Sequence, residues 1–254
     1  MIDILFSAFL LSVVLLGIHS YYGIEIIKRG IIFTDLAIGQ MAALGAAVSI
    51  RYLDGMYAYP VSVTFALTGG LAIALVSRRA QNHEAFIGLM YAFGISGIFI
   101  LLSTSPHGME SIDKLMAADI LFTPMPEILK TLGIYIFLGV AIFILNRKTT
   151  GIVREIFFFI TFALTVTSSV KLAGVLVVFS LLVGPALITS KLNSRGQLWK
   201  AWIIGTLINL AAIGISYRFD FPTGYTIVFC QAATAMMSFL FFKNEVSCLQ
   251  APGQ

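Results

Sequence analysis

Long apolar segments follow one another along almost the whole chain, and charges or turn residues separate most of them. Such segments cover residues 3–27, 31–50, 58–77, 85–104, 128–146, 156–171, 172–190, 201–217 and 223–242. A hydrocarbon core of about 30 Å needs roughly 20 apolar residues per helix. The pattern therefore predicts an all-α fold, a polytopic membrane helical bundle with about eight to nine transmembrane helices. A single domain over residues 1–254 accounts for the whole chain.

Two segments need separate interpretation. Residues 105–127 are amphipathic and end in Pro124 and Pro126, which predicts a short interfacial or re-entrant helix rather than a spanning one. The first apolar segment has no basic stretch before it and no small-residue cleavage site after it. We therefore expect a retained helix and not a signal peptide.

Composition agrees with the pattern and excludes the ordinary soluble class. Of 254 residues, 59% are hydrophobic and 11% are charged, and the mean hydropathy is +0.96. The net charge of +4 does not indicate nucleic acid, because most Lys and Arg lie in short loops between apolar segments. Cys230 and Cys248 form no CxxC pair and no metal-finger spacing.

The positions of the cations predict the orientation, because Lys and Arg are retained on the cytoplasmic side. If the N-terminus is outside, 11 of the 16 cations fall inside: Lys28, Arg29, Arg78, Arg79, Arg147, Lys148, Arg154, Lys191, Arg195, Lys200 and Lys243. The other 5 fall outside: Arg51, Lys114, Lys130, Lys171 and Arg218. We expect a multi-pass protein of the cell membrane with its C-terminus in the cytoplasm.

An ionisable group inside a bilayer is costly and is by default a functional candidate. Asp35 and Gln40 stand in the second apolar segment and carry oxygen ligands that suit a divalent cation. They are five residues apart, roughly 140° around an ideal helix, so a distortion or a second helix is needed for both to face one point. Alternatively, Asp35 caps its helix or pairs with a cytoplasmic Lys or Arg.

Three other side chains have a structural interpretation that outweighs a ligand role. Glu25 precedes Arg29 by four residues, which favours a local ion pair. His19 can bind a metal but more readily hydrogen-bonds to a neighbouring helix. His107 is a candidate metal acceptor in an outer loop, although such a residue is more often simply solvated. Hydroxyls of residues 165–169 are expected to satisfy backbone groups.

No arrangement of residues indicates an enzyme. The chain has no Ser-His-Asp or paired-carboxylate arrangement, no GxxxxGK[ST] phosphate cradle and no GxGxxG opening a helix. We therefore predict no catalytic residue and no cofactor in this chain. If ATP drives transport here, another chain must bind it.

Three stretches together resemble the membrane permeases of the ABC importers for zinc, manganese and chelated iron. Val170–Ala186 (VKLAGVLVVFSLLVGPA) is similar to the family's VKxxGxLLVxALLxxPAA, and Gly214–Val228 (GISYRFDFPTGYTIV) is similar to its SYxxDxPxGxxIV. Glu84–Tyr91 and Ala118–Leu121 fit the elements AIGxxY and GxIL. The resemblance extends over nearly the whole chain, and the order and spacing of the motifs carry it.

The chain departs from the family pattern in two places. The family's GDALSHA motif aligns without gaps after Gly30, but its Asp falls on Leu36 and its His on Gln40, with Asp35 one residue early. The loop of residues 146–155 is too short for the family's DPEFAxxxG segment, which resembles the helix that contacts the ATPase. Another loop, such as 191–200, must then dock the ATPase, unless this branch has lost ordinary coupling.

The resemblance implies a permease that translocates a divalent metal ion, zinc or manganese, as substrate, with Asp35 and Gln40 lining the path. It also implies a permease homodimer, a separate ABC ATPase subunit and an extracytoplasmic metal-binding protein as partners, in a lipid bilayer. One alternative is a membrane scaffold or regulatory subunit that translocates nothing. Another alternative is a secondary transporter that works alone.

Overall fold

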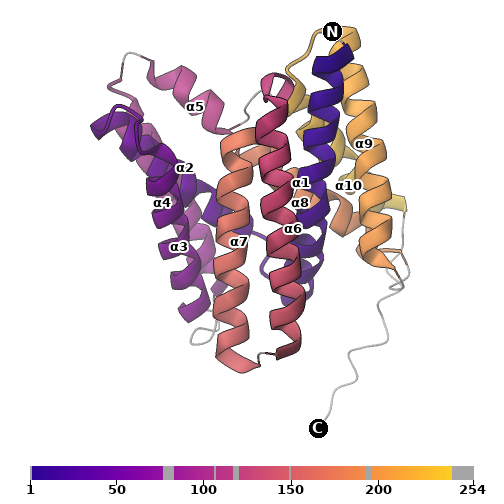
Figure 1. The fold of residues 1–254 in the computed structure, drawn as a ribbon, viewed down its shortest axis with the longest axis horizontal. Helices are drawn as coiled ribbons and strands as arrows, with labels where there is room; N and C mark the ends of the chain where they lie inside the picture. Colours follow the sequence, from indigo (N-terminus) through magenta and orange to yellow (C-terminus); the bar gives the residue numbers. More distant parts are fainter. Residues whose placement is uncertain are drawn as a thin grey trace.

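The structure is a computed structural model that describes residues 2–76, 83–105, 107–116, 120–148, 150–192 and 196–241. Within these ranges every regular element is a helix, so the all-α prediction is confirmed for the part of the chain described. The elements in chain order are α1 Ile2–Arg29, α2 Thr34–Tyr52, α3 Ala58–Val76, α4 His83–Leu102, α5 Gly108–Met116, η1 Ile120–Phe122, α6 Met125–Lys148, α7 Gly151–Ala173, α8 Val175–Ser190, α9 Gln197–Phe219 and α10 Thr223–Phe241. The long helices form one bundle (Figure 1).

Among the described residues, six helices are long and apolar enough to cross a membrane by length and composition: α1, α3, α4, α6, α7 and α9. Helix α8 has 16 residues and is apolar but shorter. Helix α2 has 19 residues, which include Asp35, Gln40 and Arg51. Length and composition thus support a multi-helix membrane bundle without confirming the predicted count of eight to nine spans.

In the region predicted to be interfacial or re-entrant, the described residues form two short helices and the start of α6. Helix α5 has 9 residues and η1 has 3. Its proline-containing end belongs instead to α6, because Pro126 stands in the first turn of that helix. Proline fits there since the first helical N–H groups have no partner within the helix.

One predicted boundary moves by two residues. Apolar segments 156–171 and 172–190 are separated at Gly174, which joins α7 to α8 with φ of 82°. A positive φ is strained for any residue with a Cβ, so glycine allows the chain to reverse there. Lys171 accordingly lies in the last turn of α7 and not between the helices.

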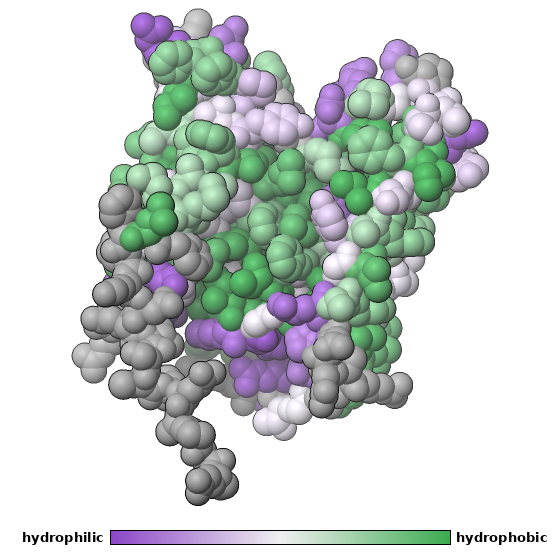
Figure 2. Space-filling view, turned by 180° about the vertical axis from the view of Figure 1, so that it is seen from behind, coloured by the Kyte–Doolittle hydropathy of each residue, from purple (hydrophilic) through white to green (hydrophobic). Residues whose placement is uncertain are grey.

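Helix α2 lies inside the bundle and positions the candidate residues. It packs against α3, α4, α7 and α8, and most of its side chains are buried. By contrast, α6 contacts mainly α1 and α7 and exposes many large apolar side chains. Figure 2 shows an apolar face with hydrophilic residues gathered along its lower edge, as expected for a protein surrounded by lipid.

Candidate metal path along helix α2

Asp35 lies in the first turn of α2 and is 1% exposed. Its Oδ1 atom is buried without a hydrogen-bond partner in the part of the chain that the structure describes. The N-cap residue is Phe33 and no side chain caps the helix, so Asp35 is not the cap. A carboxylate in this turn still benefits from the positive end of the helix dipole. The geometry leaves an oxygen ligand available inside the bundle.

Neither of the two cations that precede Asp35 at the end of α1 forms the ion pair considered for it. Lys28 Nζ lies 3.4 Å from Glu25 Oε1, and the Arg29 guanidinium lies 4.0 Å from the centre of the Phe158 ring. The ion pair expected between Glu25 and Arg29 is therefore replaced by a pair between Glu25 and Lys28. Arg29 instead makes a cation–π contact that attaches the end of α1 to α7.

Gln40 is also 1% exposed, and its surroundings are defined by two other helices. Its Nε2 atom lies 3.7 Å from the sulfur of Met116 at the end of α5. A Cβ on Gly94 of α4 would lie 2.7 Å from Gln40 Cβ, so the two helices meet at this residue. Gln40 Oε1 is buried without a partner among the described residues.

Asp35 and Gln40 face different neighbours, as their spacing predicts. A Cβ on Gly39, one turn beyond Asp35 on the same face, would meet Val175, Val170 and Val166 of α7 and α8. Gln40 instead faces α4 and α5. The two residues therefore occupy successive levels of one helix and do not form a single coordination sphere. Within the described ranges there is no group of three or more His, Cys, Asp or Glu side chains that could hold a metal.

A cavity of about 500 Å³ lies beside the part of α2 that follows Gln40, although neither Gln40 nor Asp35 lines it. Ala42, Ala43 and Ala46 of α2 line it together with residues of α3, α5 and α7. Small side chains on α2 leave the space open, while Lys114 and Lys171 contribute the cations of its wall. The cavity, Gln40 and Asp35 thus follow one another along the helix.

His19 belongs to a buried hydrogen-bonded chain, which supports its structural interpretation. Its Nδ1 lies 2.7 Å from Leu15 O and its Nε2 lies 3.2 Å from Ser169 Oγ. Because a carbonyl only accepts, Nδ1 carries the proton, and Nε2 is an acceptor beside a hydroxyl that also donates to Thr165 O at 2.8 Å. Tyr135 of α6 hydrogen-bonds to Ser168 and Ser169 of α7. The chain therefore connects α1, α7 and α6.

The other hydroxyls of this run satisfy carbonyls of α7, as expected. Thr165 Oγ1 donates to Thr161 O at 2.8 Å and Thr167 Oγ1 donates to Ala163 O at 2.7 Å. Such bonds allow polar side chains to stand inside an apolar helix without exposing a donor to lipid.

His107 lies in an exposed loop near the start of α5, and no metal cluster surrounds it in the described part of the chain. Its Nδ1 is 3.9 Å from Glu110 Oε2. Lys114 Nζ donates to Glu110 Oε1 at 2.6 Å, and this hydrogen bond lowers the pKa of the carboxyl. Glu110 is therefore paired already with Lys114.

A buried amide pair was missed by the sequence analysis. Gln231 Nε2 of α10 donates to Asn209 Oδ1 of α9 at 2.8 Å, and both residues are fully buried. Gly184 of α8 packs against Gln231. The sequence could have indicated both residues, because each amide interrupts an apolar segment in the same way as Gln40 does.

Comparisons with known proteins identify relatives among membrane proteins of metal transport systems. The chain is similar to the high-affinity zinc uptake system membrane protein ZnuB of Haemophilus influenzae, with 26% identity over 96% of this chain and 99% of that protein. It is similar to the manganese transport system membrane protein MntB of a Synechocystis strain, with 24% identity over 73% of this chain and 69% of that protein.

The fold is similar to that of PsaBC from Streptococcus pneumoniae, with a TM-score of 0.76, 16% identity, and coverage of 94% of this chain and 91% of that one. It is also similar to an inward-facing putative metal-chelate type ABC transporter, with a TM-score of 0.68, 13% identity, and coverage of 91% and 84%. The model of the ABC 3 transport family matches residues 1–242. The chain therefore belongs to the ABC 3 transport family, as the motifs along its helices predicted.

Proposed function

We propose that this chain is the membrane-spanning permease subunit of an ABC importer that moves zinc or manganese across the cell membrane. The match of the family model to residues 1–242 carries the proposal. Two relatives are named for zinc and manganese transport, and the similarity to ZnuB covers nearly the full length of both chains. Fold similarity to PsaBC supports the same assignment at the level of architecture.

The path for the metal follows α2. An ion that moves along α2 meets the amide oxygen of Gln40 and the carboxylate of Asp35. Carboxylate and amide oxygens at successive levels provide weak sites from which an ion can move on. The fact that both oxygens are buried and unpartnered in the described structure supports this role, because such groups are costly unless they have a function.

The chain crosses the membrane nine times in this proposal, with the N-terminus outside and the C-terminus inside. All helices except α5 and η1 then cross, and the cations Lys28, Arg29, Lys148 and Arg154 share the cytoplasmic side at ends of α1, α6 and α7. Arg78, Arg79, Arg195 and Lys243 belong to the same side by sequence but lie outside the described residues.

A separate ATPase supplies the energy, because no phosphate-binding motif occurs in this sequence. The connection between α7 and α6 is very short, so we assign ATPase docking to the segment between Ser190 and Gln197, where α8 ends and α9 begins. An extracytoplasmic metal-binding protein delivers the ion, and two copies of the permease form the transporter.

Uptake by reconstituted vesicles tests the proposal. The chain is co-purified with its ATPase and binding protein, and zinc and manganese uptake is measured with and without ATP. ATP-dependent uptake that is lost with an inactive ATPase is expected. Uptake by the chain alone would indicate a secondary transporter, and a stable complex that transports neither metal would indicate a scaffold.

A further inference from the structure

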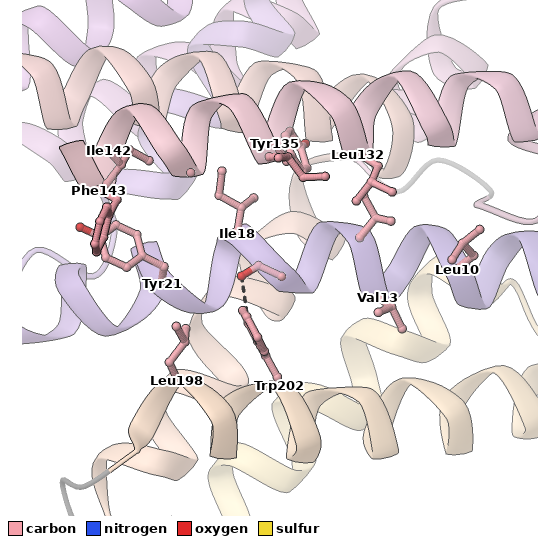
Figure 3. A pocket seen from close by; sticks show the side chains of 14 residues that line it. Leu10, Val13, Ile18, Tyr21, Leu132, Tyr135, Ile142, Phe143, Leu198 and Trp202 are labelled. Atoms are coloured by element: carbon pink, nitrogen blue, oxygen red, sulfur yellow. Dashed lines mark hydrogen bonds between the residues drawn. The ribbon is translucent and has the colours of Figure 1, made fainter. Parts of the chain in front are cut away.

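A large cavity lies on the flank of the bundle, away from α2. It has a volume of about 800 Å³ and lies between α1, α6 and α9. Figure 3 shows α1 between the other two helices, with Leu10 and Leu132 toward one end of the groove and Tyr21, Phe143 and Leu198 toward the other. Its lining is almost entirely apolar.

Two glycines open this groove. A Cβ added to Gly17 of α1 or to Gly139 of α6 would meet no atom within 4 Å, and both residues line the groove. The polar groups in the wall are turned elsewhere: Tyr135 hydrogen-bonds to serines of α7, and Trp202 Nε1 donates to Gly17 O at 2.9 Å. The space therefore accepts an apolar occupant without breaking the hydrogen bonds of Tyr135 or Trp202.

The dimensions fit one leaflet of a bilayer. Leu10 and Tyr21 mark the two ends on α1, and Leu132 and Phe143 mark them on α6. In both cases the separation is eleven residues, or about 16 Å along a helix. Half of a hydrocarbon core of about 30 Å is about 15 Å, which is the depth that one acyl chain spans.

Positive charge is placed at one end of the groove. Beyond Tyr21, α1 ends in Lys28 and Arg29, and beyond Phe143, α6 ends in Lys148. Lys28 lies 3.4 Å from the carboxylate of Glu25, so this end keeps a positive excess from Arg29 and Lys148. Lys28 lies 18 residues after Leu10, five whole turns, and so continues the groove-lining face of α1. Trp199 and Trp202 of α9 stack edge to face at 4.8 Å near the same end, and Trp199 is 66% exposed. Tryptophan and lysine together are typical of the level of lipid headgroups.

We propose that this groove binds one acyl chain of an anionic phospholipid of the cation-rich leaflet, whose headgroup lies near Lys28 and Lys148. The apolar wall and the length of the groove favour the acyl chain, and the lysines favour a negatively charged headgroup. Occupation connects α6 to α1 and α9 through the lipid, where α6 has few protein neighbours of its own.

Lipid binding to the purified full chain in detergent tests this proposal, with phosphatidylglycerol and phosphatidylcholine as probes. We expect native mass spectrometry to show phosphatidylglycerol retained preferentially, and thermal unfolding to rise by about 3–6 °C at a tenfold excess over Kd. Gly139→Leu fills the groove and should abolish both effects. Gly133→Leu is the matched control, since Gly133 is on the same helix and its Cβ also meets nothing, but it lies outside the groove.

Lys28→Gln tests the headgroup independently and should weaken phosphatidylglycerol binding severalfold. Lys114→Gln is its control, because Lys114 also pairs with a glutamate of its own helix but lies on α5. Equal retention of the two lipids, or unchanged binding in both Gly139→Leu and Lys28→Gln, would overturn the proposal. Conversion of a dimer to monomers by Gly139→Leu would show instead that a second copy of the chain fills the groove.

Discussion

Polar side chains inside this bundle fall into two groups that differ in how their polar atoms are satisfied. His19 and the hydroxyls of α7 have partners on the same or neighbouring helices. Asp35 and Gln40 each retain an unpartnered oxygen within the described structure, as Gln231 does. The oxygens of Asp35 and Gln40 lie on α2, as do the unpartnered hydroxyls of Thr34 and Ser49, but only Asp35 and Gln40 among these carry a carboxylate or an amide.

Asp35→Ala should reduce zinc and manganese uptake by an order of magnitude or more. A hydrogen bond or ligand contact to a charged group is worth about 1.5–3 kcal/mol, and each 1.4 kcal/mol changes an equilibrium about tenfold. Uptake is measured in cells at equal expression, with Asp113→Asn as the control, because Asp113 is exposed on α5. Unchanged uptake of both metals in Asp35→Ala would remove this carboxylate from the path.

Ser169→Ala should destabilise the protein by about 1 kcal/mol, because Tyr135 and His19 both lose a hydrogen-bond partner. Ser190→Ala is the control, since its hydroxyl bonds only to Leu187 O of its own helix. Thermal unfolding in detergent measures the difference. Combining Ser169→Ala with Tyr135→Phe should cost less than the sum of the two single changes, and additive costs would contradict the shared network.

At the scale of helices, glycines mark the points where α3 and α4 pack closest to α2. A Cβ on Gly45 would lie 2.8 Å from the α carbon of Ser62 on α3, and one on Gly94 of α4 would lie 3.1 Å from the carbonyl carbon of Gln40. The backbones of α2, α3 and α4 are therefore close, which is the packing expected of small residues in membrane helices. This close packing keeps α2 buried and its polar residues away from lipid.

Gly94→Ala should destabilise the protein by about 1–3 kcal/mol, because its Cβ would lie 2.7 Å from Gln40 Cβ and 3.1 Å from the Gln40 carbonyl carbon. Gly88→Ala on the same helix should be neutral or stabilising by up to about 1 kcal/mol, since nothing lies within 4 Å of that Cβ. Thermal unfolding of the two variants distinguishes them. Equal effects would mean that α4 does not meet α2 at Gln40.

The sequence predicts the helices far better than it predicts their contacts. Apolar runs located every long helix, because lipid requires about 20 apolar residues per span whatever the neighbours are. The sequence alone cannot distinguish Gly94 from Gly88. Gly94 leaves no room for a side chain because Gln40 of α2 lies beside it in the folded protein, whereas nothing lies beside Gly88. The amide pair of Asn209 and Gln231 was recognisable as polar, but its partners depend on how α9 and α10 pack.

At the scale of the whole molecule, the distribution of charge and the alternation of helices favour the same orientation. Lys28 and Arg29 end α1, Lys148 ends α6 and Arg154 lies in the first turn of α7. The connection between α4 and α6 carries His107, Glu110 and Lys114. Helix α6 separates these residues from Lys148 at its C-terminal end. Under the positive-inside rule the first group is cytoplasmic and the second is outside.

Cysteine labelling of intact cells tests this orientation. In a background with Cys230→Ala and Cys248→Ala, His107→Cys should react with a membrane-impermeant maleimide, because its side chain is 85% exposed in the outer loop. Lys148→Cys and Arg154→Cys should react only after the membrane is permeabilised, since both residues are exposed at the opposite end. Labelling of Lys148→Cys and His107→Cys from the same side would mean that both ends of α6 lie on one side of the membrane, so that α6 does not cross it. The path along α2, with Asp35 toward the ATPase, would then be excluded.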